Sequence, residues 1–443
     1  MSTKSTDYGR QWKDATTTTT NGNKEVAPAD QPTAKQIKYL TSLGISEAIG
    51  ALDEVAHAGE FPVFLIDPSQ LRILNNDYSL TFDDSKTYNR PVSFAFDCSL
   101  LNGSDHLYRK VVPAFLSRGF KLETIVDTSA DPLYPEWPIA ILAKIQTTTF
   151  HIRTFHVYED NGWWFASWNN DANCSEKILR FGIDLDHVFT EEGHLSKFRL
   201  TRLKLNGEIS RKIWVPKYPA EFIEEFAKSK FLRCEASRHS KKDPISQSNQ
   251  AIRFRHEVRK ILSVVRAAFD GIHLPFWISS GTLLGYFRHC DVIPHSKDVD
   301  IGVFADDYTH HLVTSLEKHG LKLHLWFGEI NDSLELSFVS GNGLKLDIFF
   351  FYRDKETMWN GGTQLRTGKK FRYDFSKFEL CWTLFLGLKV RVPCNTENYI
   401  VSNYGPSWQV PVEKWDWKTS PYNVRENGEW PLNRLRDVIK VFS

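Results

Sequence analysis

The stretch from Phe276 to Phe304 constrains the fold of this chain more than any other. Its sequence, FWISSGTLLGYFRHCDVIPHSKDVDIGVF, has β-branched and aromatic runs at both ends and small, polar and turn-forming residues between them. Such runs favour strands, and clusters of Gly, Pro, Asp and Ser favour turns. We therefore predict a strand over 276–280, a tight turn that opens a short helix over 280–288, a loop over 291–297 and a second strand over 298–304.

Three acidic residues in and near this stretch are predicted to converge. Asp298 and Asp300 begin the second strand, and alternate side chains on a strand share a face, so the two carboxylates lie roughly 6–7 Å apart on one side. After Asn331 a hairpin is predicted, in which LELSFVS and LKLDIFFFY are joined by a turn over 340–343. Its alternation places Asp347 among apolar neighbours, where a carboxylate is costly to bury unless it is paired or bound to a metal ion.

Three carboxylates beside a Gly-Thr turn suit a site for divalent cations and phosphate. Mg²⁺ or Mn²⁺ takes carboxylate oxygens from the protein and phosphate oxygens from the substrate. Gly281 and Thr282 open the predicted helix, so their backbone N–H groups and the positive helix end would face the same phosphates. An isolated Asp-x-Asp is more often a solvated turn or a cap, and an isolated Gly-Thr pair has little meaning. The combination favours a metal site.

These residues resemble the pattern hG[S/T] … DhD … hDh of the nucleotidyltransferase fold, in which h is hydrophobic. The pattern is carried by Ser279–Gly285, Arg288, Ile293-Pro294, Asp298-Val299-Asp300 and Leu346-Asp347-Ile348. More narrowly, the chain resembles the branch that includes bacterial phosphocholine transferases and the fukutin-like proteins of animals. The similarity covers most of 215–443 and continues through Asp332–Phe338, Met358–Thr363, Thr367–Phe371, Leu380–Thr383 and Trp415–Lys418.

The resemblance implies a metal-dependent phosphotransferase. Fukutin-like proteins are phosphoribitol transferases that use CDP-ribitol to extend an O-mannosyl glycan on α-dystroglycan. It implies that a sugar hydroxyl attacks the polyol-side phosphorus of CDP-ribitol and that CMP leaves. Asp347 is a candidate to accept the proton of the attacking hydroxyl. The resemblance also implies Mg²⁺ or Mn²⁺ at Asp298, Asp300 and Asp347, an O-mannosylated glycoprotein acceptor, other glycan-modifying enzymes as partners, and a place in the lumen of the Golgi or endoplasmic reticulum.

Basic residues near the acids are the remaining candidates for substrate contact. Arg288, Lys297, Lys369 and Lys370 are predicted to hold phosphates or donor hydroxyls, although an exposed pair such as Lys369-Lys370 is more often plain surface. The chain departs from the bacterial pattern at 295–297, where His-Ser-Lys replaces Trp-Asp-Asp. This puts a base beside the metal site, which argues against phosphocholine as the donor group.

We expect an α/β or α+β protein with three segments. Residues 1–35 are rich in Thr, Ser, Asn and Lys and are predicted to be disordered. Residues 36–235 are predicted to form a mixed α/β domain of unassigned role. Residues 236–443 are predicted to form a nucleotidyltransferase-like catalytic domain. The polar, basic stretch over 237–249 is the expected linker.

Within the N-terminal domain we find no catalytic constellation. Helices are expected up to Glu60, with Gly44 and Gly50 as breaks. Strands are expected over 61–66, 91–96, 139–148 and 154–158, and a helix over 219–231. The acids Asp97, Asp184 and Asp186 are better explained as turn residues.

Composition excludes several classes. The net charge of +1 provides no overall field that would favour nucleic acid as a partner. No run of 18 or more apolar residues occurs, so no transmembrane segment is expected in the printed sequence. The six cysteines lack C-x-x-C spacing, which argues against a zinc ribbon or redox pair. Cys381 and Cys394 can bridge in an oxidising compartment, but the pairing stays open.

Two helices and an aromatic tail are expected around the acids. Ile252, Val258, Ile261, Val265 and Phe269 recur at nearly helical spacing and predict the buried stripe of a helix, whose basic residues are expected to face solvent. A second helix is expected over 307–320. The tail over 399–431 is dense in Trp, Tyr and Pro, and core packing is favoured over ligand stacking for its tryptophans.

Three alternatives to the phosphotransferase stay open. A nucleotidyltransferase that moves the nucleotide itself, or a phosphocholine-type transferase with another acceptor, would use the same acids; the nucleotidyltransferase would release pyrophosphate rather than CMP. A glycosyltransferase also uses Asp-x-Asp with a nucleotide-sugar, but it needs neither the upstream Gly-Thr turn nor the third acid. A non-catalytic glycan-binding protein would not need three intact carboxylates.

Overall fold

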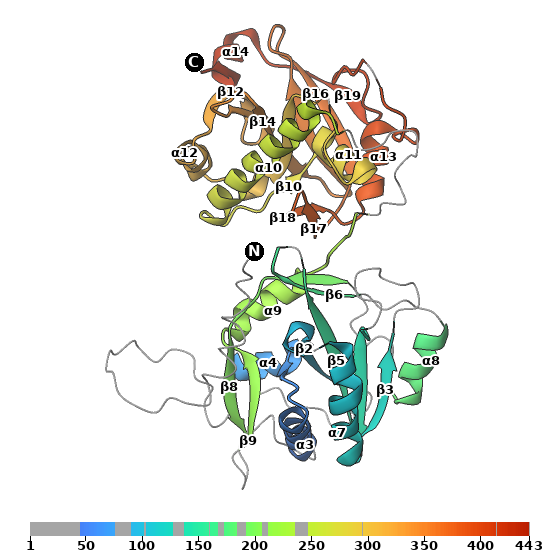
Figure 1. Cartoon of the computed structure of the whole chain (residues 1–443). Helices are drawn as coiled ribbons and strands as arrows, with labels where there is room; N and C mark the ends of the chain where they lie inside the picture. Colours follow the sequence, from blue (N-terminus) through green and yellow to red (C-terminus); the bar gives the residue numbers. More distant parts are fainter. Residues whose placement is uncertain are drawn as a thin grey trace, which may run out of the picture. The chain divides into compact units, whose positions relative to one another are not determined.

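The chain divides between Lys230 and Phe231 into two compact units, drawn in the computed structural model of Figure 1. The structure describes residues 45–75, 90–101, 103–126, 137–158, 160–166, 172–183, 192–205, 211–234, 247–294, 296–412 and 414–442. The segment predicted to be disordered, 1–35, and most of the predicted linker, 237–249, lie outside the described residues. No helix in the described ranges is both long enough and apolar enough to cross a membrane.

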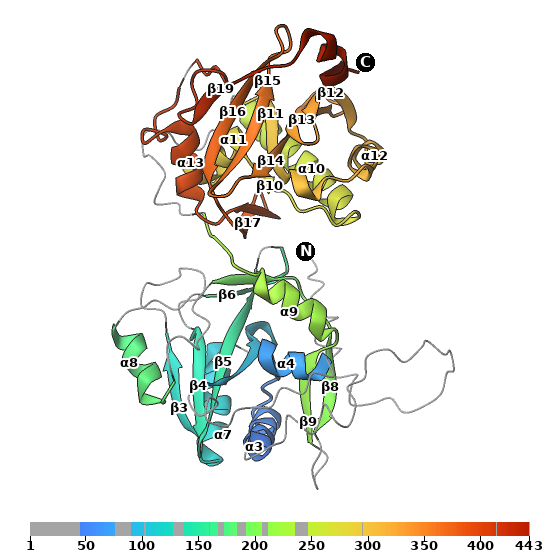
Figure 2. The same ribbon diagram turned by 180° about the vertical axis from the view of Figure 1, so that it is seen from behind.

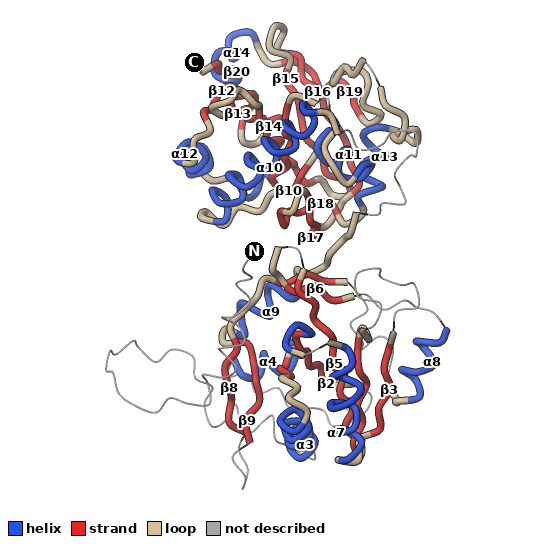
Figure 3. The backbone as a smooth tube through the Cα atoms, in the orientation of Figure 1, coloured by secondary structure: helices blue, strands red, loops and turns tan. Residues whose placement is uncertain are grey.

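The first unit is a mixed sheet with helices beside it, as Figure 3 shows by colour. Its strands are β1 (Val63–Leu65), β2 (Val92–Asp97), β3 (Lys121–Ile125), β4 (Ala140–Ile145), β5 (Thr148–Val157), β6 (Trp163–Phe165), β7 (Gly193–Leu195), β8 (Leu200–Leu205) and β9 (Arg211–Pro216). Its helices are α3 (Ile45–Ala58), α4 (Pro68–Asn75), α6 (Ser104–His106), α7 (Val112–Ser117), α8 (Ala172–Arg180) and α9 (Pro219–Ala227). The sheet order is β3-β4-β5-β2-β1-β9-β8, with β2/β5 and β1/β9 parallel.

Two predictions for this unit need correction. Gly50 does not break the first helix, because α3 runs from Ile45 to Ala58. Its neighbours Ile49 and Leu52 are each 1% exposed, and their burial outweighs the roughly 1 kcal/mol that a glycine costs inside a helix. The strand expected over 154–158 begins earlier, at Thr148.

Asp97 has a structural role in this unit. It is 1% exposed, and its carboxylate accepts hydrogen bonds from Ser99 N at 2.8 Å and from Trp163 Nε1 at 2.8 Å. It therefore caps the short 3-10 helix that follows β2, in agreement with a turn role. Asp184 and Asp186 lie outside the described residues.

The second unit contains the stretch with the three acids. Its strands are β10 (Trp277–Ile278), β11 (Asp298–Phe304), β12 (Lys322–Glu329), β13 (Asp332–Val339), β14 (Lys345–Arg353), β15 (Thr357–Thr363), β16 (Lys369–Ser376), β17 (Leu380–Phe385), β18 (Leu388–Pro393), β19 (Val424–Glu429) and β20 (Ile439–Val441). Its helices are α10 (Asn249–Asp270), α11 (Ser280–His289), α12 (His311–Lys318), α13 (Thr396–Tyr404) and α14 (Leu435–Val438).

A nine-stranded sheet organises this unit. Its main order is β19-β16-β15-β14-β13-β12-β20, and β11 joins β14 in parallel with β10 on its other side. Figure 1 shows α10 crossing in front of the sheet, and Figure 2, seen from behind, shows β15, β16 and β14 in front. Leu346, Ile348 and Phe350 on β14 are completely buried in the core shared with α10, so the alternate side chains of β14 face the other way.

Helix α10 follows its predicted stripe with one exception. Ser248 caps the helix by accepting from Ala251 N at 3.2 Å, and Val258 is among the residues buried along it. Ile252, which was predicted to be buried, is 46% exposed, and Ala251 is buried instead. Ala251 lies seven residues before Val258, which is two helical turns, whereas Ile252 lies one position off that repeat.

The tryptophans of the tail divide into two kinds. Trp408 and Trp430 are 6% and 7% exposed, which confirms core packing for these two. Trp415 and Trp417 are 41% and 39% exposed, so core packing was wrong for them. The segment that carries Trp408, Trp415 and Trp417 runs from α13 to β19 at the edge of the sheet.

Two disulfides cross-link the second unit. Cys381–Cys394 closes the β17–β18 hairpin, which is the bridge that the sequence left open. Cys234–Cys290 ties the segment before α10 to the residue that follows α11. Both bridges suit an oxidising compartment.

Removing either bridge is expected to destabilise the second unit. In the chain-entropy relation the 56-residue separation of Cys234–Cys290 corresponds to about 4 kcal/mol of unfolding free energy, and the 13-residue separation of Cys381–Cys394 to about 3 kcal/mol. Urea unfolding followed by tryptophan fluorescence checks this with the two paired Cys→Ser variants. Unchanged midpoints in both variants would contradict a stabilising role.

Candidate active site

Asp298, Asp300 and Asp347 meet where the neighbouring strands β11 and β14 begin. The parallel register places Asp300 opposite Asp347. One carboxylate oxygen of each residue lies within 4.8 Å of the others. Asp300 and Asp347 are 8% and 4% exposed, and Asp298 is half-buried. The fold thus brings together the three acids that the sequence analysis singled out.

The acids carry more negative charge than their surroundings neutralise. Burial raises the pKa of Asp300 well above its usual range, and the charges of Asp298 and Asp347 raise it further. Burial also raises the pKa of Asp347, although Lys345 and Ser337 oppose the shift. A buried cluster of oxygen donors with excess negative charge is the kind of site that Mg²⁺ or Mn²⁺ fits.

The turn that opens α11 acts on Asp300. Gly281 N and Thr282 N donate to Asp300 Oδ2 at 2.9 and 3.4 Å, and Thr282 Oγ1 accepts from Asp300 N at 2.8 Å. A Cβ at position 281 would lie 3.2 Å from Asp300 Oδ2, so glycine leaves room for this contact. The amides predicted to hold phosphate are therefore directed at a carboxylate, and they orient a candidate metal ligand.

The acids lie on the wall of a cavity of about 1000 Å³ in the second unit. Gly281, Arg288 and Lys297 also line it, so three of the six predicted substrate contacts reach the cavity. Arg288 is 5% exposed; its Nε donates to His289 Nε2 at 2.7 Å and its Nη1 contacts Trp408 O at 3.5 Å. Thr282 supports the wall from behind through Asp300.

Lys369 and Lys370, which were also predicted to contact substrate, do not line this cavity. Lys370 Nζ pairs with Asp332 Oδ2 at 2.6 Å and lies 4.5 Å from the centre of the Trp430 ring. Lys369 is exposed, and its Nζ lies 3.9 Å from Glu426 Oε1 on β19. Strand pairing commits both side chains to neighbours outside the cavity, and neither residue lines it.

Three residues of the site were not predicted. Lys345 Nζ pairs with Asp347 Oδ2 at 2.8 Å, and Ser337 Oγ donates to Asp347 Oδ1. Burial would lower the pKa of Lys345, but the charges of Asp347, Glu335 and Asp298 outweigh burial and raise it. Burial raises the pKa of Glu335 to about 8. The alternation of side chains along a strand could have identified them, because Lys345 shares a face with Asp347 and Glu335 shares a face with Ser337.

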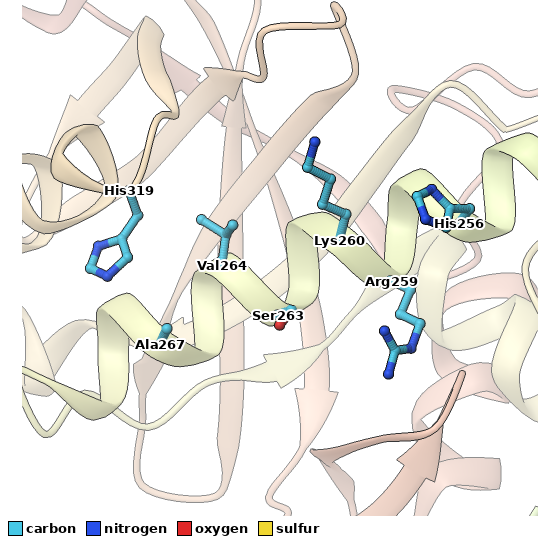
Figure 4. A pocket seen from close by; sticks show the side chains of 7 residues that line it. All are labelled: His256, Arg259, Lys260, Ser263, Val264, Ala267 and His319. Carbon is cyan, nitrogen blue, oxygen red and sulfur yellow. The ribbon is translucent and has the colours of Figure 1, made fainter. Parts of the chain in front are cut away.

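The basic residues of α10 point elsewhere. Figure 4 shows His256, Arg259 and Lys260 extending from α10 around a second hollow of about 500 Å³, with His319 from the end of α12 at its other side. Arg255 forms a bidentate pair with Asp291, with its Nη2 at 2.6 Å from Oδ2. No α10 residue lines the cavity of the acids in the described part of the chain, so the helix does not contribute charge to it directly.

Sequence comparison assigns the segment that contains these acids to a known family. Residues 273–395 match the family described as LicD/FKTN/FKRP, nucleotidyltransferase domain. Human ribitol-5-phosphate transferase FKTN is 35% identical to this chain over 401 residues, which cover 86% of this chain and 85% of the human protein. This chain belongs to the fukutin (FKTN) family. The resemblance stated from the sequence is thereby confirmed.

Other known proteins are similar to longer or shorter parts of this chain. The mouse ribitol-5-phosphate transferase FKTN is 35% identical over 410 residues, covering 86% of this chain and 85% of that protein. The mouse ribitol 5-phosphate transferase FKRP is 26% identical over 165 residues, which are 34% of this chain and 31% of that protein. The solved structure of the lincosamide antibiotic adenylyltransferase LnuA with bound lincomycin matches 30% of this chain and 78% of its own chain, at 19% sequence identity and a TM-score of 0.21.

Proposed function

We propose that this chain transfers ribitol 5-phosphate from CDP-ribitol to a sugar hydroxyl of an O-mannosyl glycan on a glycoprotein of the α-dystroglycan type, releasing CMP. The observation that carries the proposal is the convergence of Asp298, Asp300 and Asp347 in one cavity of a chain that is 35% identical to human ribitol-5-phosphate transferase FKTN. The transferred group would form a phosphodiester with the acceptor oxygen as the bond between the donor phosphorus and the CMP oxygen breaks.

Asp298, Asp300 and Asp347 would hold Mg²⁺ or Mn²⁺. When bound, such an ion neutralises charge on the diphosphate oxygens and stabilises the leaving CMP. Asp300 is pre-oriented for this role by the amides of Gly281 and Thr282, at 2.9 and 3.4 Å. Positioned ligands lower the reorganisation that the site needs on binding its substrates.

The basic side chains around the acids would bind the donor. Arg288, Lys297 and Lys345 all line the cavity, and they match the negative charge of a diphosphate. Asp347 would accept the proton of the attacking hydroxyl. Burial raises the pKa of Asp347, whereas Lys345 and Ser337, which bond to its carboxylate, lower it.

Lys297 is expected to set the choice of donor. Two cations roughly 6 Å apart, such as the Lys297 ammonium and the quaternary ammonium of a choline donor, repel each other by about 3 kcal/mol at an effective dielectric of about 20. Lys297 is exposed, so screening reduces this to a preference of about tenfold for a neutral polyol over a quaternary ammonium donor. We expect CDP-ribitol to have a higher kcat/KM than CDP-choline. We expect Lys297→Asp to reduce the ratio of these two kcat/KM values.

The control for this prediction is Lys318→Asp, at the exposed end of α12, which should leave the ratio unchanged. Equal use of both donors by the wild type, or an unchanged ratio in Lys297→Asp, would show that Lys297 does not select the donor. The other two residues that differ from the bacterial pattern are neighbours of Lys297. Ser296 Oγ donates to Asp298 Oδ1 at 3.0 Å, and His295 lies outside the described residues.

The assay that tests the proposed function measures the released product. The purified chain is incubated with an O-mannosyl glycopeptide and CDP-ribitol, CDP-glycerol or CDP-choline. Acceptor-dependent release of CMP from CDP-ribitol supports the proposal. Release of pyrophosphate from CTP with transfer of the nucleotide would instead identify a nucleotidyltransferase. Transfer from CDP-choline alone would identify a phosphocholine-type enzyme.

A further inference from the structure

The wall of the acid cavity also includes a run of uncharged residues. The segment between α13 and β19 contributes Ser407, Trp408, Val410, Pro411, Val412, Trp415, Trp417 and Pro421 to this wall. The three acids, Glu335, Arg288, Lys297 and Lys345 line the same cavity, and Arg288 Nη1 lies 3.5 Å from Trp408 O. A ligand that fills the cavity can therefore contact both charged groups and this uncharged segment.

Large apolar side chains of this cavity wall are exposed. Trp415 and Trp417 are 41% and 39% exposed, and Val410, Val412 and Leu365 on the same cavity are 64%, 58% and 50% exposed. A contiguous group of exposed apolar residues marks a binding surface more often than an accident of folding. We call Trp415 and Trp417 the aromatic rim.

The aromatic rim is held in place by contacts on its inner side. The Trp415 ring packs on Tyr404, with 4.9 Å between ring centres and 34° between planes. The Trp417 ring meets the edge of Phe371 at 5.3 Å, and Trp417 O accepts from Tyr373 OH at 2.8 Å. The inner contacts fix the two indoles, so a ligand that stacks on them costs little side-chain entropy.

Two residues of β15 continue this surface along the cavity wall. A Cβ at Gly362 would lie 3.0 Å from Trp417 Cζ3, so the glycine lets the indole lie against the strand. Asn360, two residues away on the same face, lines the cavity and is 5% exposed. Its Oδ1 accepts no hydrogen bond from any described residue. Such a buried, unsatisfied acceptor calls for a ligand donor.

We propose that Trp415, Trp417 and Asn360 form the subsite for the acceptor sugar. A pyranose ring has an apolar C–H face that stacks on an indole and hydroxyls that donate to an acceptor such as Asn360 Oδ1. The uncharged acceptor sugar suits the uncharged residues of this wall, and the diphosphate of the donor suits the basic side chains and the acids that would hold the metal ion. This assignment rests on the proposed function, since it takes the second substrate to be a glycan.

Binding and transfer are measured separately with the full chain. Titration calorimetry gives the Kd of an O-mannosyl glycopeptide and, independently, the Kd of CDP-ribitol with Mg²⁺. For Trp415→Ala, Trp417→Ala and Asn360→Ala we expect the glycopeptide Kd and the acceptor KM to rise about tenfold each, with the CDP-ribitol Kd within twofold of wild type. Trp417→Phe should recover most of the affinity because it restores an aromatic face.

Tyr422→Ala is the matched control, because Tyr422 is 76% exposed near the same segment but does not line the cavity. It should change neither Kd. Melting temperatures establish that each variant is folded. A Leu variant, which keeps side-chain bulk but has neither an aromatic face nor a polar acceptor, replaces any Ala variant that is not folded.

The outcomes separate the two proposals. Loss of CDP-ribitol binding in the rim variants would overturn the assignment and make the rim a platform for cytosine. Unchanged glycopeptide binding in all three variants, or no glycopeptide binding by the wild type, would also overturn it. If the wild type binds the glycopeptide through the rim but transfers no ribitol phosphate, the proposed function fails and the subsite stands.

Discussion

Replacing Asp298 or Asp300 by Asn is expected to reduce turnover about a thousandfold while the protein stays folded. The substitution conserves volume, and an Asn carbonyl at position 300 still accepts the N–H of Gly281, which donates to Asp300 Oδ2 at 2.9 Å. Losing a metal ligand removes on the order of 4 kcal/mol of transition-state stabilisation. Steady-state kinetics with CDP-ribitol and a glycopeptide acceptor measures the loss.

Stability measurements distinguish lost chemistry from lost structure. Burial raises the pKa of Asp300 above its unfolded value, so the charged side chain opposes folding at neutral pH. In the absence of metal, Asp300→Asn should therefore keep or increase the free energy of unfolding. Asp306→Asn is the matched control, since Asp306 pairs with Arg353 and does not line the cavity; its activity should stay within twofold. Activity within tenfold of wild type in folded Asp300→Asn would overturn the metal assignment.

Removing divalent cations is expected to abolish turnover completely and reversibly. Three carboxylates provide only part of a coordination shell, and the donor phosphates would complete it, so the ion should leave readily when chelated. Excess EDTA should silence the wild type, and Mg²⁺ or Mn²⁺ should restore it. Full activity in EDTA would exclude this mechanism.

A thermal-shift measurement supports the same point without catalysis. Mg²⁺ or Mn²⁺ should raise the Tm of the wild type, because a ligand that binds only the folded state stabilises it by mass action. The increase should be smaller in Asp298→Asn and absent in the double variant of Asp298 and Asp300. An equal increase in all three proteins would place the ion elsewhere.

Local patterns made the core of the catalytic unit predictable. The strand predicted over 298–304 has the bounds of β11, and the hairpin predicted around 340–343 is β13 and β14. Alternation with a period of two fixes which side chains share a face, so Asp298 and Asp300 had to project together. The burial of Asp347 followed from its apolar neighbours in the same way.

Contacts between distant segments were not predictable from the same patterns. Whether the amides of Gly281 and Thr282 point at phosphate or at Asp300 depends on the distance between α11 and β11, which no local signal sets. Lys370 was predicted to contact phosphate, but the pairing of β15 with β16 places its side chain beside Asp332. The aromatic rim was not predicted, because the number of tryptophans in a segment does not tell which of them pack into the core.

Mass analysis of the acceptor tests the central claim most directly. The full chain, CDP-ribitol and Mg²⁺ are incubated with an O-mannosyl glycopeptide, alongside the Asp298→Asn and Asp300→Asn variants. We expect the wild type to add the mass of one ribitol phosphate to the glycan, in proportion to the CMP released, and the variants to add none at the same time point. Addition of a nucleotide or a sugar, or an acceptor left unmodified by the folded, metal-loaded wild type, would contradict the account.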